Sequence, residues 1–349
     1  MMNRRKTLKS KRIDLPDTLE NIYAFICQQG WGDGLPIIPP TEERVGKMID
    51  YVDRYPDEVV AQVAPIDGEA TIEKIAINAV MVGCLPEYMP VIIAAVEAMT
   101  SPEFNLSSIQ TTTNPVTALA IINGPVRQKI NINCTTGCMG PGWRANATIG
   151  RSIRFILINI GGGKPDIIDR AAHGMPGKYT FCFGEYEEGN PWQPLHVERG
   201  FPNESSTVTI VGAQATHNVL TVAKNAPMIL KLAANSMSTL GNNNMVFTEG
   251  EPLVVITSAH AAILAEAGFT KETVKQVIFD NAGVPEAEYP PEIATPSKKL
   301  CVVNGKVKPC ERAEDIMLVI TGAPNPSHLV TIPTFGPTRA VTRPIHVKD

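Results

Sequence analysis

Hydrophobic positions along the chain recur with two periods, one typical of helices and the other of buried strands. Apolar residues at spacings of three and four predict helices over 17–29, 41–52, 71–83, 87–99, 219–237, 259–267 and 270–280. Short apolar runs predict strands over 118–123, 207–211, 253–257 and 316–321. Because these strands alternate with helices of about 10–20 residues, we expect an α/β fold with a mixed or parallel sheet and helices on its faces.

Local signals mark where several of these elements begin and end. Asp17 with Glu20 three residues on has the spacing of a capping box, and Thr41 is placed to cap the second helix. Pro227 is expected to break the helix over 219–237.

The alternation is compatible with two similar α/β halves. The predicted division is a flexible N-terminal tail over 1–16, an α/β domain over 17–204 that carries the site loops, and a second α/β half over 205–349. A proline-rich surface loop is expected over 284–298. An irregular proline-rich arm is expected from Pro324 onwards, packing on the body or on a partner subunit.

Composition narrows the class of protein. The chain is 44% hydrophobic and 19% charged, an ordinary globular balance, and its net charge of −4 argues against a general nucleic-acid binder. The most apolar window, Ile75–Met99, is interrupted by prolines and charged residues, so no membrane span is predicted. Seven cysteines, an odd number, do not resemble a secreted disulfide framework, and a reducing cytoplasm is expected.

The segment Asn131–Gly163 carries the first candidate site. An apolar stripe predicts a helix from about Trp143 to Ile160, led by Gly140-Pro141-Gly142 and closed by three glycines. The loop Cys134–Gly142 then lies at the helix N-terminus, where free N–H groups favour an anion. Arg144 and Arg151, seven residues apart, share one helix face and are candidates for holding a substrate anion.

Two thiols lie in this loop. The helix end and the arginines would favour the thiolate form of a cysteine. Cys138 is therefore the leading candidate nucleophile, and Cys134 is its partner or the nucleophile itself. The C-x3-C spacing is neither the redox C-x2-C pattern nor a strong metal motif, and both nucleotide-binding glycine motifs are absent. The alternative is a tight turn with two buried thiols.

The segment 178–201 gathers acids, bases, aromatic residues and a thiol, a mixture typical of a site lining. His196 and Glu198 would share one side of an extended chain, as an acid–base pair or, together with Cys182, as metal ligands; a salt-bridged structural histidine is the alternative. Trp192 and Arg199 are candidate substrate contacts. Earlier in the chain, Asp33 on a Gly-Asp-Gly turn is a further candidate, and His173 lies in a loop that could close over the site.

Several phrases resemble one protein family. They are WGDGLPIIPPTEERV, AINAVMVGCLPEYMPV, GPGWRANATIGR, PWQPLHVERGF and IMLVITGAPNPSH. The chain resembles an uncharacterised bacterial and archaeal family, the large partner of small proteins that bear a selenocysteine- or cysteine-Gly-Ser-Cys motif. The resemblance implies no specific reaction. It implies that a separate small subunit supplies the redox residue, because this chain has TTGC at 135–138 and no such motif of its own.

Together these features favour an enzyme, or the large subunit of a two-component enzyme, that transforms a small, anionic organic substrate by thiol-dependent chemistry, with redox chemistry included. Two alternatives stay open: a metal-dependent hydrolase or lyase using His196, Glu198 and Cys182, and a non-catalytic binding or assembly subunit. A homo- or hetero-oligomer is expected, and the sequence specifies no cofactor.

Overall fold

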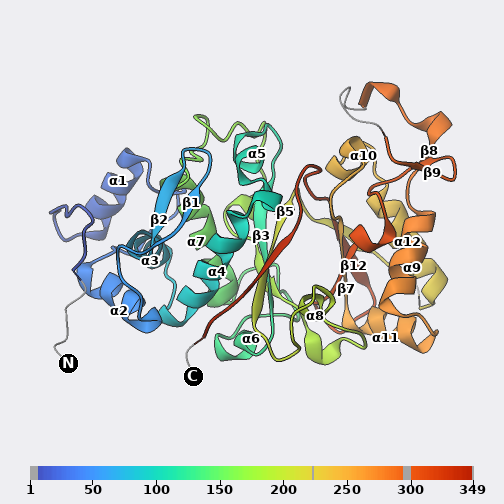
Figure 1. Ribbon diagram of the computed structural model, residues 1–349, viewed down its shortest axis with the longest axis horizontal. Helices are drawn as coiled ribbons and strands as arrows, with labels where there is room; N and C mark the ends of the chain where they lie inside the picture. Colours follow the sequence, from blue (N-terminus) through green and yellow to red (C-terminus); the bar gives the residue numbers. More distant parts are fainter. Residues whose placement is uncertain (1–6, 222–223, 294–299, 348–349) are drawn as a thin grey trace.

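The computed structural model describes residues 7–221, 224–293 and 300–347. Its elements form four layers, in which two central sheets lie face to face and each carries helices on its outer side (Figure 1). The prediction of an α/β protein with mixed sheets and covering helices is confirmed.

The first sheet has the order β13-β5-β3-β4. Its strands are β3 (Thr117–Asn123), β4 (Cys182–Gly184), β5 (Thr207–Ala213) and β13 (Val341–Pro344). The β3 strand runs parallel to β4 and antiparallel to β5, so that Ile122 pairs with Gly184. The carboxyl ends of β3 and β4 therefore lie at the same edge of the sheet.

The second sheet has the order β11-β7-β12-β6. Its strands are β6 (His217–Leu220), β7 (Leu253–Ile256), β11 (Met317–Ile320) and β12 (His328–Ile332). Here β7 and β11 are parallel and in register, with Ile256 beside Ile320. The remaining strands form small sheets of β1 (Val59–Val63) with β2 (Gly68–Thr71), and of β8 (Val284–Pro285), β10 (Lys306–Val307) and β9 (Val302–Val303).

Period-two alternation along the central strands builds three cores from the two sheets. In β3, Ala120 and Ile122 face the first helical layer, while Ile121 points into the core between the sheets. In β11, Ile320 faces the second helical layer and Val319 meets the inter-sheet core. Both sheets thus bury two faces, which explains why their strands read as continuous apolar runs.

Helices cover the outer faces. On the first sheet lie α4 (Met89–Met99) and α7 (Arg144–Asn159). Outside these two helices lie α2 (Glu42–Val52) and α3 (Ile72–Met81), with α1 (Leu19–Gln29) at the edge. On the second lie α9 (Ala226–Met237), α11 (Ser258–Glu266) and α12 (Lys271–Asn281). Short helices are α5 (Leu106–Thr111), α6 (Val126–Lys129), α8 (Leu195–Glu198) and α10 (Asn243–Phe247).

Several boundaries differ from those expected. Thr18 rather than Asp17 caps α1, because its hydroxyl accepts from the Asn21 N–H. The helix expected from residue 219 begins only at Ala226, with Pro227 in its first turn, where a missing N–H has no cost. Residues 217–220 form strand β6 instead, paired with β12.

The C-terminal stretch is not an irregular arm. Residues 328–332 form β12 inside the second sheet, and residues 341–344 cross back as β13 of the first sheet. The layers consequently do not divide the chain at residue 204, since β5 and β13 both belong to the first sheet. Part of the loop expected over 284–298 folds as β8 and two 3₁₀ turns, and residues 294–299 lie outside the described residues.

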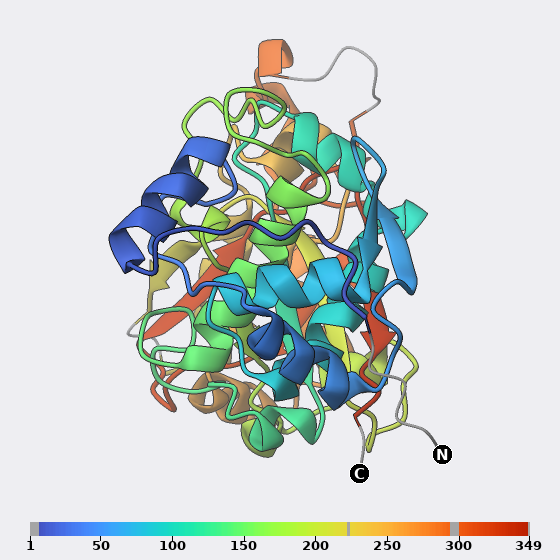
Figure 2. The same cartoon turned by 90° about the vertical axis from the view of Figure 1, so that its left-hand side faces the viewer.

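Residues 7–16 are not a free tail. The buried Glu73 carboxylate accepts the Lys9 N–H at 2.9 Å and the Ser10 N–H at 2.9 Å. Figure 2 shows the extended segment running across the outer helical layer toward α1. Residues 1–6 of the predicted tail lie outside the described residues.

Glu73→Ala should release this segment, because two backbone donors lose a buried carboxylate acceptor. We expect trypsin to cleave after Lys9 and Lys11 several-fold faster than in the unmodified protein, measured by mass spectrometry of timed digests. Asp57→Asn, which removes only the exposed pair with Lys9, is the matched control and should leave the rate unchanged. Equal cleavage of both variants would contradict the docking of this segment.

Candidate active site

The cysteine loop is fastened to the first turn of α7. The Asn146 carboxamide accepts the Asn133 N–H at 2.8 Å and donates to the carbonyl oxygens of Asn133 and Cys138, at 2.9 and 3.2 Å. This confirms the predicted placement of the loop at the start of a helix, since α7 begins at Arg144.

The same loop also docks on the second sheet. At the carboxyl end of β11, the Thr321 hydroxyl lies 2.7 Å from the Cys134 carbonyl oxygen, 2.9 Å from that of Gly184 and 3.3 Å from the Cys138 sulfur. The Gly322 N–H donates to the Cys134 carbonyl at 3.2 Å. A side chain at Gly184 would clash, because its Cβ would lie 2.7 Å from Ile132 and 3.2 Å from the Cys134 Cβ. The thiol loop therefore joins the carboxyl ends of strands from both sheets.

A cleft of about 360 Å³ opens beside Cys138. It lies at the carboxyl ends of the parallel strands β7 and β11, a frequent position for ligands in α/β sheets. Its polar lining consists of uncharged groups with one histidine, and its members are Cys138, Asn218, Thr257, Thr321, Asn325 and His328. His328 is exposed and its Nδ1 lies 3.2 Å from the Asn218 amide nitrogen.

Thr321 and burial act in opposite directions on the Cys138 thiol. The Thr321 hydroxyl is placed to donate to the Cys138 sulfur, and at shorter distances to the carbonyl oxygens of Cys134 and Gly184. Burial raises the pKa of the Cys138 thiol, and the Thr321 contact and nearby N–H groups reduce that rise only in part. The net shift of the Cys138 pKa is upward, so burial disfavours the thiolate.

Cys134 faces a different environment. Its sulfur lies 3.8 Å from Arg127 Nη1, so the guanidinium beside it is neither Arg144 nor Arg151. Burial raises the pKa of the Cys134 thiol, although the Arg127 charge opposes the shift. The expectation that the helix end and those two arginines favour a thiolate is therefore wrong for both cysteines, because desolvation outweighs the nearby positive groups.

Arg127 connects the thiol loop to an acidic cluster. It binds the Glu188 carboxylate through two bonds of 3.1 Å and lies 3.0 Å from Glu187. The cluster also contains Glu185, which is fully buried and accepts from the Asn123 and Asn190 amides and from the Leu195 N–H. Burial raises the pKa of Glu185. These carboxylates are held by hydrogen bonds and one arginine, and only Glu188 reaches solvent extensively.

His196 lies at the edge of this cluster. Its Nε2 lies 3.2 Å from the Asn203 carbonyl, and Nδ1 faces Glu187 Oε1 at 3.9 Å. At that distance the two atoms are not hydrogen-bonded, and the buried His196 Nδ1 has no hydrogen-bond partner among the described residues. His196 therefore lies beside the contacts that join Glu187, Arg127 and Cys134, and it is not bonded to them.

The predicted pairing of His196 with Glu198 is wrong. The segment is not extended but forms the short helix α8, so the two side chains point apart. Glu198 instead binds Lys271 at 2.7 Å and Lys275, both on α12. Its carboxylate fastens α8 to the second helical layer.

The alternative metal site is not assembled either. Cys182 is buried in the first core, where burial raises its pKa strongly, while Glu198 binds lysines of the second layer. Across residues 7–221, 224–293 and 300–347, no group of three histidine, cysteine or acidic side chains is placed to hold a metal ion. Cys182, His196 and Glu198 are close in sequence, but Cys182 lies on β4 in the first core and Glu198, on α8, binds lysines of α12.

Asp33 and the two predicted substrate arginines have protein partners. Arg151 donates two hydrogen bonds to the Asp33 carboxylate, at 2.7 and 2.8 Å. The Arg151 side chain is 15% exposed and the Asp33 side chain 5% exposed. Arg144 donates to the Gly83 carbonyl at 2.9 Å. These groups pack the 31–36 turn and the end of α3 against α7 and do not line the Cys138 cleft.

Trp192 and Arg199 are also held by the protein. The Trp192 indole donates to the Phe269 carbonyl at 3.1 Å and packs on the second helical core. Arg199 binds Glu251 at 3.2 Å and the Ala340 carbonyl at 2.5 Å, which ties α8 to β13. His173 lines a separate cleft beside α7.

The sequence missed two central residues, Arg127 and Thr321, and it marked His328 only as a weak candidate, because a lone histidine is more often structural than functional. Thr321 directly follows β11 and His328 is the first residue of β12. Their position at the end of a strand was the one signal that the sequence offered. Arg127 lies in a short helix after β3 and had no distinguishing pattern.

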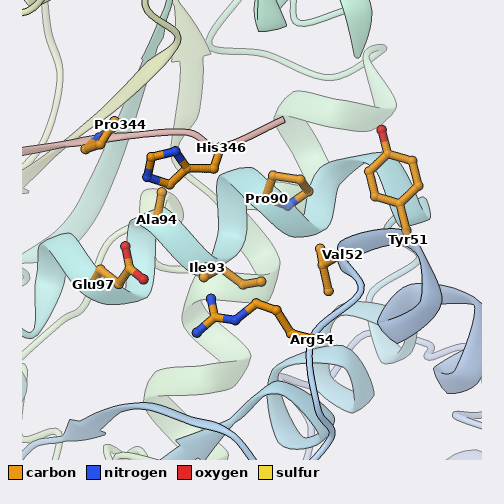
Figure 3. Close-up of a pocket in the computed structure, with 9 residues that line it drawn as sticks. All are labelled: Tyr51, Val52, Arg54, Pro90, Ile93, Ala94, Glu97, Pro344 and His346. Carbon is orange, nitrogen blue, oxygen red and sulfur yellow. The ribbon is translucent and has the colours of Figure 1, made fainter. Parts of the chain in front are cut away.

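Another, smaller cleft lies on the first helical layer. Its volume is about 120 Å³, and Tyr51, Arg54, Glu97 and His346 contribute its polar groups (Figure 3). Arg54 is paired with Glu58 at 2.6 Å. Because no residue predicted for the site lines it, the Cys138 cleft is the stronger candidate.

No family model matches the chain, and no curated protein matches it significantly. The family resemblance stays a prediction. Among the described residues, no helix is long and apolar enough to cross a bilayer.

Asp33→Asn should lower the free energy of unfolding by about 3 kcal/mol, because it leaves the half-buried Arg151 without its charge partner. Urea denaturation measures the change. Glu43→Gln, which breaks an exposed pair with Lys47, is the control and should have no measurable effect. An unchanged stability in Asp33→Asn would return Asp33 and Arg151 to the role of substrate contacts.

Alkylation by iodoacetamide should report the raised thiol pKa values. Because only the thiolate reacts, labelling of Cys134 and Cys138 in the folded protein should still increase with pH at values where the same cysteines in urea have reached a plateau. Peptide mass mapping against the exposed Cys27 measures this. A plateau near neutral pH in the folded protein would contradict the desolvated thiol.

Proposed function

We propose that this protein is an enzyme, acting alone or as the large subunit of a two-component enzyme, that transforms a small organic substrate at the Cys138 thiol. One observation carries the proposal: Cys138 lines a cleft at the carboxyl ends of two parallel strands, with its sulfur fixed by Thr321. A buried structural thiol would need neither the cleft nor a histidine on its rim.

The lining favours an uncharged substrate. Among the described residues that line this cleft there is no arginine, lysine or carboxylate, and Arg144 and Arg151 have partners elsewhere. The proposal therefore replaces the anionic substrate expected from the sequence with a neutral carbonyl compound, whose oxygen the Asn218, Asn325 and His328 side chains could contact.

Addition to such a carbonyl requires that the Cys138 thiol lose its proton to a base, because the thiolate is the nucleophile. A bond forms between the Cys138 sulfur and the carbonyl carbon, the C=O π bond breaks, and the thiol proton ends on the carbonyl oxygen. His328, on the same cleft, is the group to carry that proton. The step yields a hemithioacetal and needs neither an oxidant nor a reductant.

Competition between an aldehyde and iodoacetamide tests this function. At pH 9, glycolaldehyde should slow the alkylation of Cys138, and the effect should saturate as its concentration rises. Alkylation of the exposed Cys27 in the same protein should slow only as much as that of a free thiol in solution. Glyoxylate, its anionic counterpart, should protect less. His328→Asn should slow adduct formation on the order of 100-fold, the loss expected for a removed proton carrier.

Cys138→Ser is the negative control and should bind no aldehyde covalently, as read by intact mass after rapid quenching. Protection of Cys138 that merely follows that of Cys27, or an adduct rate unchanged in His328→Asn, would overturn the proposal.

A further inference from the structure

A separate cleft of about 530 Å³ lies between α7 and the loop that follows it. Its lining includes the charged residues Arg154, Asp169 and Lys178, of which the first two are buried, together with His173, Met175 and Tyr179. Arg154 is 8% exposed, and it comes from the third turn of α7, eight residues or about 12 Å beyond Asn146, which binds the cysteine loop.

Two cations share one carboxylate here. Asp169 lies 2.7 Å from Arg154 Nη2 and 2.7 Å from Lys178 Nζ. The other acids of the cleft have their own cations, because Asp33 pairs with Arg151 and Asp166 with Arg170. Arg154 and Lys178 therefore carry two positive charges against one carboxylate, and no other carboxylate among the described lining residues compensates the second charge. Because a charge removed from water is costly until an opposite charge compensates it, this excess indicates a missing anion.

The hydrogen-bond donors of the two cations are also incompletely used. Arg154 reaches Asp169 and the Gly163 carbonyl only through Nη2; within the described parts of the chain its Nε and Nη1 have no hydrogen-bond partner. The Lys178 ammonium has three N–H groups, and the structure shows hydrogen bonds from it only to the two Asp169 oxygens. These unused donors belong to side chains that line the cleft.

We propose that this cleft binds the carboxylate or phosphate group of a small organic anion, with Arg154 and Lys178 as its ligands and Tyr179 at the side of the bound molecule. Both groups carry oxygen acceptors that match a guanidinium and an ammonium. The inference does not depend on the proposed thiol chemistry, since none of these residues lines the Cys138 cleft. It assigns the anion-binding role to Arg154 in place of Arg144 and Arg151.

Calorimetric titration with inorganic phosphate and with succinate, at ionic strength fixed by chloride, tests the site. Both probes should bind saturably, and their ratio of affinities identifies which class the site prefers. Lys178→Met should weaken the better probe at least about tenfold by removing a charged contact. Lys47→Met removes an equal charge from an exposed side chain on α2 that does not line the cleft, and it should leave the affinity unchanged.

A second measurement needs no variant. The bound anion should slow acetylation of Lys178 by an N-hydroxysuccinimide ester with the same saturation as the calorimetric titration, while alkylation of Cys138 stays unchanged. Absence of saturable binding, equal loss of affinity in Lys178→Met and Lys47→Met, or protection of Cys138 in place of Lys178 would each overturn the inference.

Discussion

Face-to-face packing of the two sheets is the constraint on which the rest of the structure depends. Residues such as Ile121 of β3 and Val319 of β11 can be buried only if the inner faces meet, and the helices then must cover both outer faces. This arrangement brings the carboxyl ends of β3 and β4 beside that of β11. Tyr186, just after β4, donates its N–H to the Ile320 carbonyl at 2.7 Å, so a backbone hydrogen bond joins the two sheets here.

The cysteine loop lies where the carboxyl ends of strands from the two sheets meet, and its chemistry follows from that position. Thr321 holds the loop through the Cys134 carbonyl and the Cys138 sulfur, so the thiol cannot move independently of the second sheet. Packing between layers removes water from both sulfurs and raises their pKa values, whereas a solvent-exposed loop at a helix end would lower them. The same residues read in isolation pointed to the opposite protonation state.

Charge pairing separates structural cations from available ones. Arg127, Arg151 and Arg199 each bind at least one carboxylate, and each connects two segments distant in sequence. Arg154 and Lys178 differ because they share Asp169 and face open space. The spacing of arginines along α7 could not make this distinction, because the partner of Arg151 comes from the 31–36 turn and that of Arg154 from the loop after α7.

The sequence by itself determined the class of fold, most element positions and the helix that follows the cysteine loop, because those depend on local periodicity, caps and turns. It misjudged residues 217–220 and the C-terminal stretch, whose strand pairing comes from distant partners. Only the tertiary structure decided which side chains meet. It placed Thr321 on Cys138 and Arg127 on Cys134, turned Glu198 away from His196, and gave Arg151 to Asp33. Contacts and desolvation arise between layers, and no pattern along one segment encodes them.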